Sequence, residues 1–309
     1  MLSRARLFLL LTSSIGFASA GFPQVLAGHY WKRDGDVAFN NKWLDHDKIV
    51  ALPQVPGYDT DREIQLAFRP LLHAKGGCVP YAAVDANGSA GKGLRPTGDS
   101  GGDCRDSEQT GQVYTRIGRS HGRRGVMYSY YLPKVHGKEQ QHRHHWITVV
   151  VWLRIDGCGD FIDDYKPLGV AYSKHPQGTF DISRQDTIFV KASDSTTATS
   201  PVILYDGGVP LMPAPGNPEG ALSPSLVAWQ RLQQPTQEQL NGIQYEHTQV
   251  PFNDANFQAT LDAAYDDAFY HNVPQEDDKC GQEEPTQADI DPDVTEPEEP
   301  GPRPSDVRM

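Results

Sequence analysis

The chain has 309 residues, of which 38% are hydrophobic, and it carries a formal net charge of −12. An acidic chain without a basic cluster lacks the charge that nucleic-acid binding requires. Its 29 glycines and 24 prolines favour many short strands joined by turns over a helical bundle.

Residues 1–20 have the three parts of a secretory signal peptide. Two arginines give a basic start, an apolar segment begins at Leu7, and small residues at positions 18–20 form a cleavage site. The apolar segment is too short to span a bilayer, and no later segment is apolar enough for a transmembrane helix. We therefore expect a secreted, extracellular protein in which residues 21–44 form an N-terminal extension.

The chain contains four cysteines, Cys78, Cys104, Cys158 and Cys280. In the oxidising compartment that a signal peptide implies, disulfides persist, and four cysteines can pair in three ways. The sequence contains no C-x-x-C pair, so we do not expect a zinc site built on cysteine. Asn87 begins an Asn-Gly-Ser glycosylation sequon in a Gly-rich loop. We therefore expect a disulfide-stabilised glycoprotein.

The central part of the chain contains two strand-like segments. Val126–Leu132 is aromatic and ends at Pro133. Trp146–Leu153 is β-branched and aromatic without any charge, which is typical of a strand covered on both faces. We expect a polar loop between them that presents ligand-type side chains from a rigid base.

Three histidines, His142, His144 and His145, precede the second strand. If that strand begins near His144, its period of two places His145 and Ile147 on one face and His144 on the other. Imidazole suits zinc or copper, but this alternation disfavours a site of all three histidines. The simpler interpretation is two loop histidines and one packed at a sheet end. No hydrolase or nucleotide-binding motif accompanies them, so we do not expect an enzyme.

Later segments complete the predicted domain. Thr187–Lys191 and Pro201–Tyr205 have the composition of strands. Apolar residues within Phe257–Tyr265 recur at helical spacing, and Asp254 is a candidate N-cap for this helix.

The C-terminal segment, residues 274–309, is acidic and rich in proline. It contains twelve acids and three bases and almost no large apolar residue. Such a segment cannot bury enough surface to offset chain entropy, so we expect a disordered tail.

Together these motifs resemble the necrosis- and ethylene-inducing-peptide-like proteins, the NLP cytolysins. The family heptad Gly-His-Arg-His-Asp-Trp-Glu corresponds here to Gln141–Ile147, and a Val-Val-Val-Trp run follows as in the family. Further matches, in family order, include His46–Val50, Gly77–Pro80, Gly93–Gly98, Gly102–Asp106 and Val250–Phe257. The resemblance implies a β-sandwich of two antiparallel sheets with flanking helices, similar to actinoporins, over residues 45–273.

The heptad departs from the family at the cation ligands. Relatives bind a hard divalent cation through the first His, the Asp and the Glu of the heptad and an Asp that precedes it. The resemblance maps these ligands onto His142, His145, Ile147 and Val135, so only His142 is retained. Calcium and magnesium require oxygen ligands and carboxylate charge. We therefore expect the Ca or Mg ion to be weakly bound or absent, and no other cofactor.

The resemblance also implies a set of functions. Relatives bind inositol-phosphoceramide sphingolipid head groups of plant plasma membranes and lyse cells with the help of the cation. A member that keeps His142, Arg143, His144 and Trp146 but loses the other ligands should be a weakly cytolytic or non-cytolytic monomer. The alternatives are a secreted glycan- or head-group-binding protein without lysis, and a cation-independent cytolysin. A host immune receptor that recognises Gly125–Arg143 is a further candidate partner.

The resemblance also bears on the cysteines. It implies a Cys78–Cys104 disulfide, which leaves Cys158 and Cys280 to form a second one.

Overall fold

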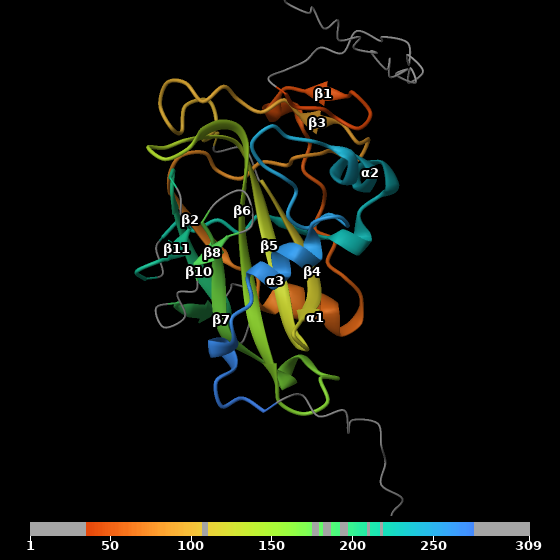
Figure 1. Ribbon diagram of the computed structural model, residues 1–309, viewed down its shortest axis with the longest axis vertical. Coiled ribbons are helices and arrows are strands. Elements are labelled where there is room, and N and C mark those ends of the chain that lie inside the picture. The colour runs from red at the N-terminus through yellow and green to blue at the C-terminus, as the bar shows by residue number, and fades with distance from the viewer. Residues whose placement is uncertain are drawn as a thin grey trace, which may run out of the picture.

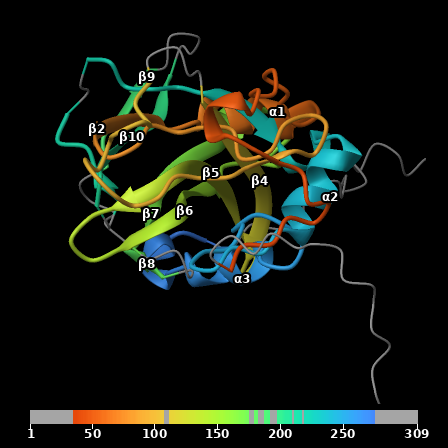
Figure 2. The same cartoon turned by 90° about the horizontal axis from the view of Figure 1, so that it is seen from above.

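The computed structural model describes residues 35–106, 111–174, 179–181, 187–191, 197–208, 211–216 and 219–274 (Figure 1). The predicted signal peptide, the acidic tail and Cys280 lie outside these residues. Two stacked sheets with helices against them form the domain (Figure 2), which confirms the predicted mostly β sandwich. None of the described helices is long and apolar enough to cross a membrane.

The larger sheet has the strand order β12-β4-β5-β6-β7-β8. Its strands are β4 (Gln112–Ser120), β5 (Arg123–His136), β6 (Gln141–Ile155), β7 (Tyr165–Ser173), β8 (Phe180–Asp181) and β12 (Ser225–Ala228). The smaller sheet has the order β11-β10-β2, with β9 beside β10. Its strands are β2 (Leu71–Gly76), β9 (Phe189–Lys191), β10 (Ala198–Asp206) and β11 (Met212–Pro213).

In the described residues, three α-helices and a small strand pair surround these sheets. The helices are α1 (Asp59–Ala67), α2 (Gln234–Gly242) and α3 (Phe257–Ala263). The strands β1 (Trp43–Leu44) and β3 (Ala90–Gly91) pair with each other in parallel. Seen from above, α1 lies on the same side of the larger sheet as β2 and β10, and α3 lies on the opposite side (Figure 2).

Both sheets are mixed, whereas the resemblance implied antiparallel sheets. The strand β12 runs parallel to β4, and β2 runs parallel to β10. Each parallel pair joins strands that are far apart in the sequence. Parallel neighbours require a long crossover connection. The connection from β2 to β10 is long because it contains most strands of the larger sheet.

The β5–β6 hairpin is longer than predicted and contains all three histidines within β6. The polar residues from Gln141 to His145 continue the ladder against β5 instead of forming a loop. Pro133 does not end β5. Pro133 and His144 face each other in the hairpin but are not paired in the ladder, so no hydrogen bond from Pro133 is needed there. His144 has a positive φ of 54°, and such an irregular position tolerates a proline that cannot donate a hydrogen bond.

Different layers cover the two faces of this hairpin. The Tyr128 hydroxyl donates to the backbone oxygen of Gln65 in α1 (3.0 Å). From the other face, Trp152 Nε1 donates to the backbone oxygen of Ala264 at the end of α3 (2.9 Å). Burial on both faces explains the uncharged sequence of the second predicted strand.

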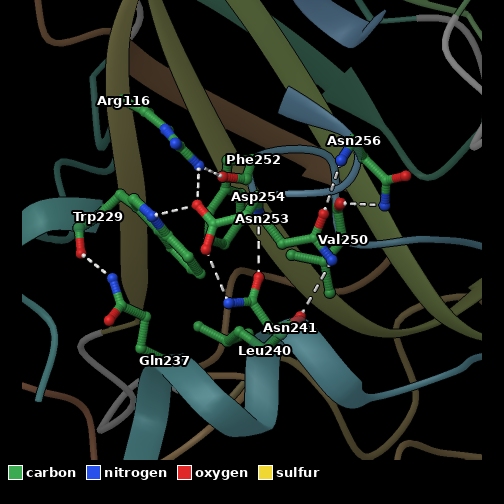
Figure 3. Close-up of polar contacts among 10 residues, drawn as sticks. All are labelled: Arg116, Trp229, Gln237, Leu240, Asn241, Val250, Phe252, Asn253, Asp254 and Asn256. Atoms are coloured by element: carbon green, nitrogen blue, oxygen red, sulfur yellow. Dashed lines mark hydrogen bonds and ion pairs between the residues drawn. The ribbon is translucent and has the colours of Figure 1, made fainter. Parts of the chain in front are cut away.

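Asp254, the predicted N-cap of the last helix, is instead a junction between elements (Figure 3). Its carboxylate accepts hydrogen bonds from Arg116 Nη1 (3.0 Å), Trp229 Nε1 (3.0 Å) and Asn241 Nδ2 (2.9 Å). The helix α3 begins at Phe257 without a side-chain cap. Asp254 therefore connects β4, the turn after β12 and the end of α2.

Residues 35–44 of the predicted extension pack onto the domain. Val37 exchanges two backbone hydrogen bonds with Gln244 (2.7 and 2.8 Å). The Asp36 side chain is buried, and its Oδ1 accepts from the backbone N–H of Glu246 (2.8 Å). These contacts hold the extension against the segment that follows α2.

Cys78 and Cys104 form the predicted disulfide. The loop that it closes contains Asn87, which is exposed in a turn where Gly88 has a φ of +75°. Cys158 is also disulfide-bonded, and Cys280, its predicted partner, lies outside the described residues.

Candidate functional site

The heptad lies at the start of β6, at the end of the sandwich where β1 and β3 are found (Figure 1). The register pairs Val135 with His142, Leu132 with His145 and Tyr130 with Ile147. The four predicted ligand positions 135, 142, 145 and 147 therefore occupy neighbouring places on one hairpin. All four are buried, with exposed fractions of 1, 7, 1 and 2%.

His145 is a buried imidazole without hydrogen bonds. Only 1% of it is exposed, and neither ring nitrogen has a hydrogen-bond partner. Burial, with a smaller effect from the neighbouring His142, lowers the pKa of His145 from 6.5 to about 3. The ring is therefore neutral where the family places a carboxylate.

His144 connects the strand to the N-terminal extension. Its Nδ1 lies 2.7 Å from the Tyr131 hydroxyl, and its Nε2 lies 3.2 Å from Asp36 Oδ2. The second contact has the distance of an ion pair without the alignment of a hydrogen bond. Burial lowers the pKa of His144 even though the nearby carboxylate opposes this. His144 is therefore a neutral structural residue.

His142 has one ring nitrogen fixed and the other directed at a side chain. Its Nδ1 lies 3.0 Å from the Arg143 carbonyl oxygen and 2.9 Å from that of His144, so this nitrogen carries the proton and donates. Its Nε2 then carries the lone pair and lies 3.2 Å from Gln140 Oε1, which is also an acceptor, so these two atoms do not hydrogen-bond in this tautomer. Burial lowers the pKa of His142, while the backbone hydrogen bonds oppose the shift.

A pocket of about 290 Å³ opens beside His142. Three further segments contribute to it: the N-terminal extension, the loop around residue 95 and the segment after α2. Its lining residues are Asp36, Arg95, Pro96, Thr97, Gln141, His142, Arg143, Glu246 and His247. The His142 ring centre lies 5.4 Å from that of His247 and 5.5 Å from that of His145.

Four of these lining residues, Asp36, Arg95, Glu246 and His247, were not predicted from the sequence as site residues. Arg95 lies within the Gly93–Gly98 match but was not predicted to line a site, and no motif marks the other three residues. All four meet the heptad only because the sandwich folds their segments together. Arg143, which belongs to the heptad, also lines the pocket.

Two other residues support the heptad strand. Trp146 belongs to the core, where its ring packs edge-on against Tyr114 (5.6 Å) and Phe252 (5.3 Å). Gly93 has a φ of +63°, and a Cβ there would lie 2.8 Å from His144 Cε1. The loop at Gly93 can approach the strand this closely because glycine has no side chain.

The residues at the family's ligand positions do not fit a hard cation. Val135 and Ile147 have no donor atoms, and His145 is neutral and buried. In the part of the chain that the structure describes, no three His, Cys, Asp or Glu side chains are already arranged to hold a metal ion. Calcium and magnesium prefer several oxygen ligands, which these positions do not supply.

Two stacked sheets, with helices against both faces of the larger sheet, define a sandwich of the toxin-fold class. A solved structure described as "Toxin fold as basis for microbial attack and plant defense" covers 72% of this chain with a TM-score of 0.59 and 28% identity. The chain belongs to the necrosis inducing protein (NPP1) family, whose model matches residues 62–264.

Individual relatives agree with this assignment. The chain is 30% identical over 231 residues to necrosis-inducing protein NPP1 of Phytophthora nicotianae, covering 72% of this chain and 90% of the relative. It is 30% identical over 226 residues to NLP effector protein 7 of Phytophthora capsici, covering 72% and 68%. The crystal structure of the non-toxic HaNLP3 protein superimposes with a TM-score of 0.61 at 28% identity, covering 71% of this chain and 98% of that one.

Proposed function

We propose that this chain is a secreted, non-enzymatic NLP-type protein with weak or no cytolytic activity, because its hard-cation site is largely lost. The observation that carries this proposal is the chemistry of the four ligand positions. Hydrocarbon occupies 135 and 147, and a neutral buried imidazole occupies 145. Calcium and magnesium are held by negatively charged oxygen ligands, and these three positions provide none.

The surroundings do not replace the missing carboxylates. Asp36 is turned toward His144 and the Glu246 backbone. The pocket is also lined by Arg95 and Arg143, whose guanidinium charges oppose the two carboxylates of Asp36 and Glu246. A hard divalent cation therefore meets little net negative charge in the pocket.

Vesicle leakage and calorimetry test this proposal. Purified protein is added to vesicles with and without inositol-phosphoceramide sphingolipid, in calcium, in magnesium and in chelator. We expect no calcium or magnesium binding and little dye release in any condition. Strong sphingolipid-dependent leakage in calcium or magnesium would overturn the proposal. Leakage that is equal in chelator would indicate the alternative of a cation-independent cytolysin.

A second candidate function is glycan binding without lysis. It is favoured by the pocket of about 290 Å³, and by a solved relative described as NLPPya in complex with mannosamine. That structure has a TM-score of 0.60 and 27% identity, and covers 72% of this chain and 99% of that one. A glycan array in chelator tests this function, with Arg143→Gln as the pocket variant. Binding that persists in chelator and falls in the variant supports it.

Recognition by a host receptor is a less direct candidate. Most of Gly125–Arg143 lies in β5, where the side chains from Val126 to Val135 are buried. A receptor would need this segment as a released peptide. A synthetic peptide of residues 125–143 tested beside the folded protein would separate the two cases.

A further inference from the structure

Three ligand-type side chains, His142, Glu246 and His247, line one pocket. The rings of His142 and His247 have centres 5.4 Å apart, and His247 Nε2 lies 3.7 Å from Glu246 Oε1. Two imidazoles on one tetrahedral zinc ion have centres about 5 Å apart, and neighbouring donor atoms are about 3.4 Å apart, given metal–donor distances of about 2.1 Å. We propose that His142, Glu246 and His247 bind a divalent transition-metal ion of the zinc class.

His142 already has the second contact that a metal-bound histidine usually has. Its Nδ1 donates to the backbone oxygens of Arg143 and His144, which fixes the tautomer and leaves Nε2 as the lone-pair nitrogen. Histidine ligands in metal sites commonly donate their other N–H to a backbone carbonyl or a carboxylate in this way. The contact orients Nε2 for an ion before any ion binds.

Closing the site requires the side chains of Gln140, Glu246 and His247 to rotate. In the described residues the three donor atoms do not converge, and His142 Nε2 faces Gln140 Oε1 at 3.2 Å. The Gln140 amide must turn away. The side chains of His247 and Glu246 are 53% and 45% exposed, and exposed rotamers exchange in nanoseconds or less. The Glu246 and His247 side chains can therefore turn quickly toward His142 Nε2.

The chemistry of the pocket selects the class of metal. Two imidazole nitrogens and one carboxylate suit zinc, copper or nickel, whereas calcium and magnesium require oxygen ligands. Arg95 and Arg143 also line the pocket, which further disfavours ions held by charge alone. The proposed site shares only His142 with the family's ligand set and does not depend on the proposed loss of lysis.

Calorimetry with zinc chloride tests the site on tag-free protein that has been stripped with chelator. We expect one zinc ion per chain and no binding of calcium or magnesium. His247→Gln and Glu246→Gln should each weaken zinc binding by more than roughly tenfold, because loss of a group that only hydrogen-bonds to a metal ligand already costs about tenfold. His271→Gln, at an exposed histidine outside the pocket, is the matched control and should leave the affinity unchanged. Cobalt(II) should give the visible absorption of a tetrahedral nitrogen–oxygen site.

Several results would overturn the proposal. These are the absence of zinc binding, zinc binding that is unchanged in both pocket variants, and an equal loss in the His271 control. Both pocket variants change half-exposed side chains, and an unchanged circular dichroism melt confirms that they fold. None of these outcomes affects the proposed function, which is tested by calcium, magnesium and vesicle leakage.

Discussion

Acid should destabilise this protein through His145. Burial lowers the pKa of this imidazole from 6.5 to about 3, so the folded state resists the proton that the unfolded chain accepts. The stabilisation from a depressed pKa is fully present above the unfolded value and is lost as pH falls below it. The loss therefore begins near pH 6.5 and continues toward pH 3.

The magnitude follows from the shift. Between the two pKa values, each pH unit of acidification lowers the free energy of unfolding by about 1.4 kcal/mol. A pH of 5 lies about 1.5 units below the unfolded pKa of 6.5. Acidification from pH 7 to pH 5 should therefore cost about 2 kcal/mol through this side chain alone. The pKa values of His142 and His144 are also lowered, so the whole protein should lose more.

His145→Leu isolates this contribution. Leucine does not titrate, and it removes two ring nitrogens that have no hydrogen-bond partner, so the variant should be about as stable as the native protein at pH 7. Urea unfolding followed by tryptophan fluorescence, in chelator, gives the free energy of unfolding at pH 7 and pH 5. The native protein should lose about 2 kcal/mol more than the variant. Equal losses would refute the reasoning, and His271→Leu should behave as the native protein does.

Three further predictions concern the loop between Cys78 and Cys104. Gly93→Ala should lower the free energy of unfolding by roughly 1–3 kcal/mol and more than Gly98→Ala does; both positions have a positive φ, but only at Gly93 does the new Cβ meet other atoms. Serine at both cysteines should cost roughly 3 kcal/mol in urea unfolding; an unchanged midpoint would contradict this. Asn87→Gln should remove one glycan from protein secreted by a eukaryotic host, visible as a loss of mass without a change in melting temperature.

The sequence predicted the parts of the fold that local patterns determine. The uncharged run Trp146–Leu153 is a buried strand because both of its faces are covered. The polar residues Gln141–His145 were predicted as a loop because their strand character comes from pairing with β5 and from cover by distant segments. Asp254 likewise has the composition of a cap, but tertiary contacts with Arg116, Trp229 and Asn241 determine its role.

In the candidate site, too, local patterns predicted some residues and only the tertiary structure revealed the others. A motif comparison identified His142 and the substituted positions beside it. Glu246 and His247 are about a hundred residues away in the chain and carry no motif, so only the folded pocket brings them to His142. Short motifs identify residues that act from one strand, whereas a site assembled from several loops requires coordinates.

The buried contact between Asp36 and His144 shows that the surroundings of the heptad include a residue far from it in the sequence. The family model matches residues 62–264, yet the carboxylate that faces His144 belongs to residue 36. Two relatives with identical heptads can therefore differ at this end of the molecule if their leading segments differ. A chain shortened to the shared region would lose that carboxylate and one wall of the pocket, and its behaviour would not represent that of a chain that keeps residue 36.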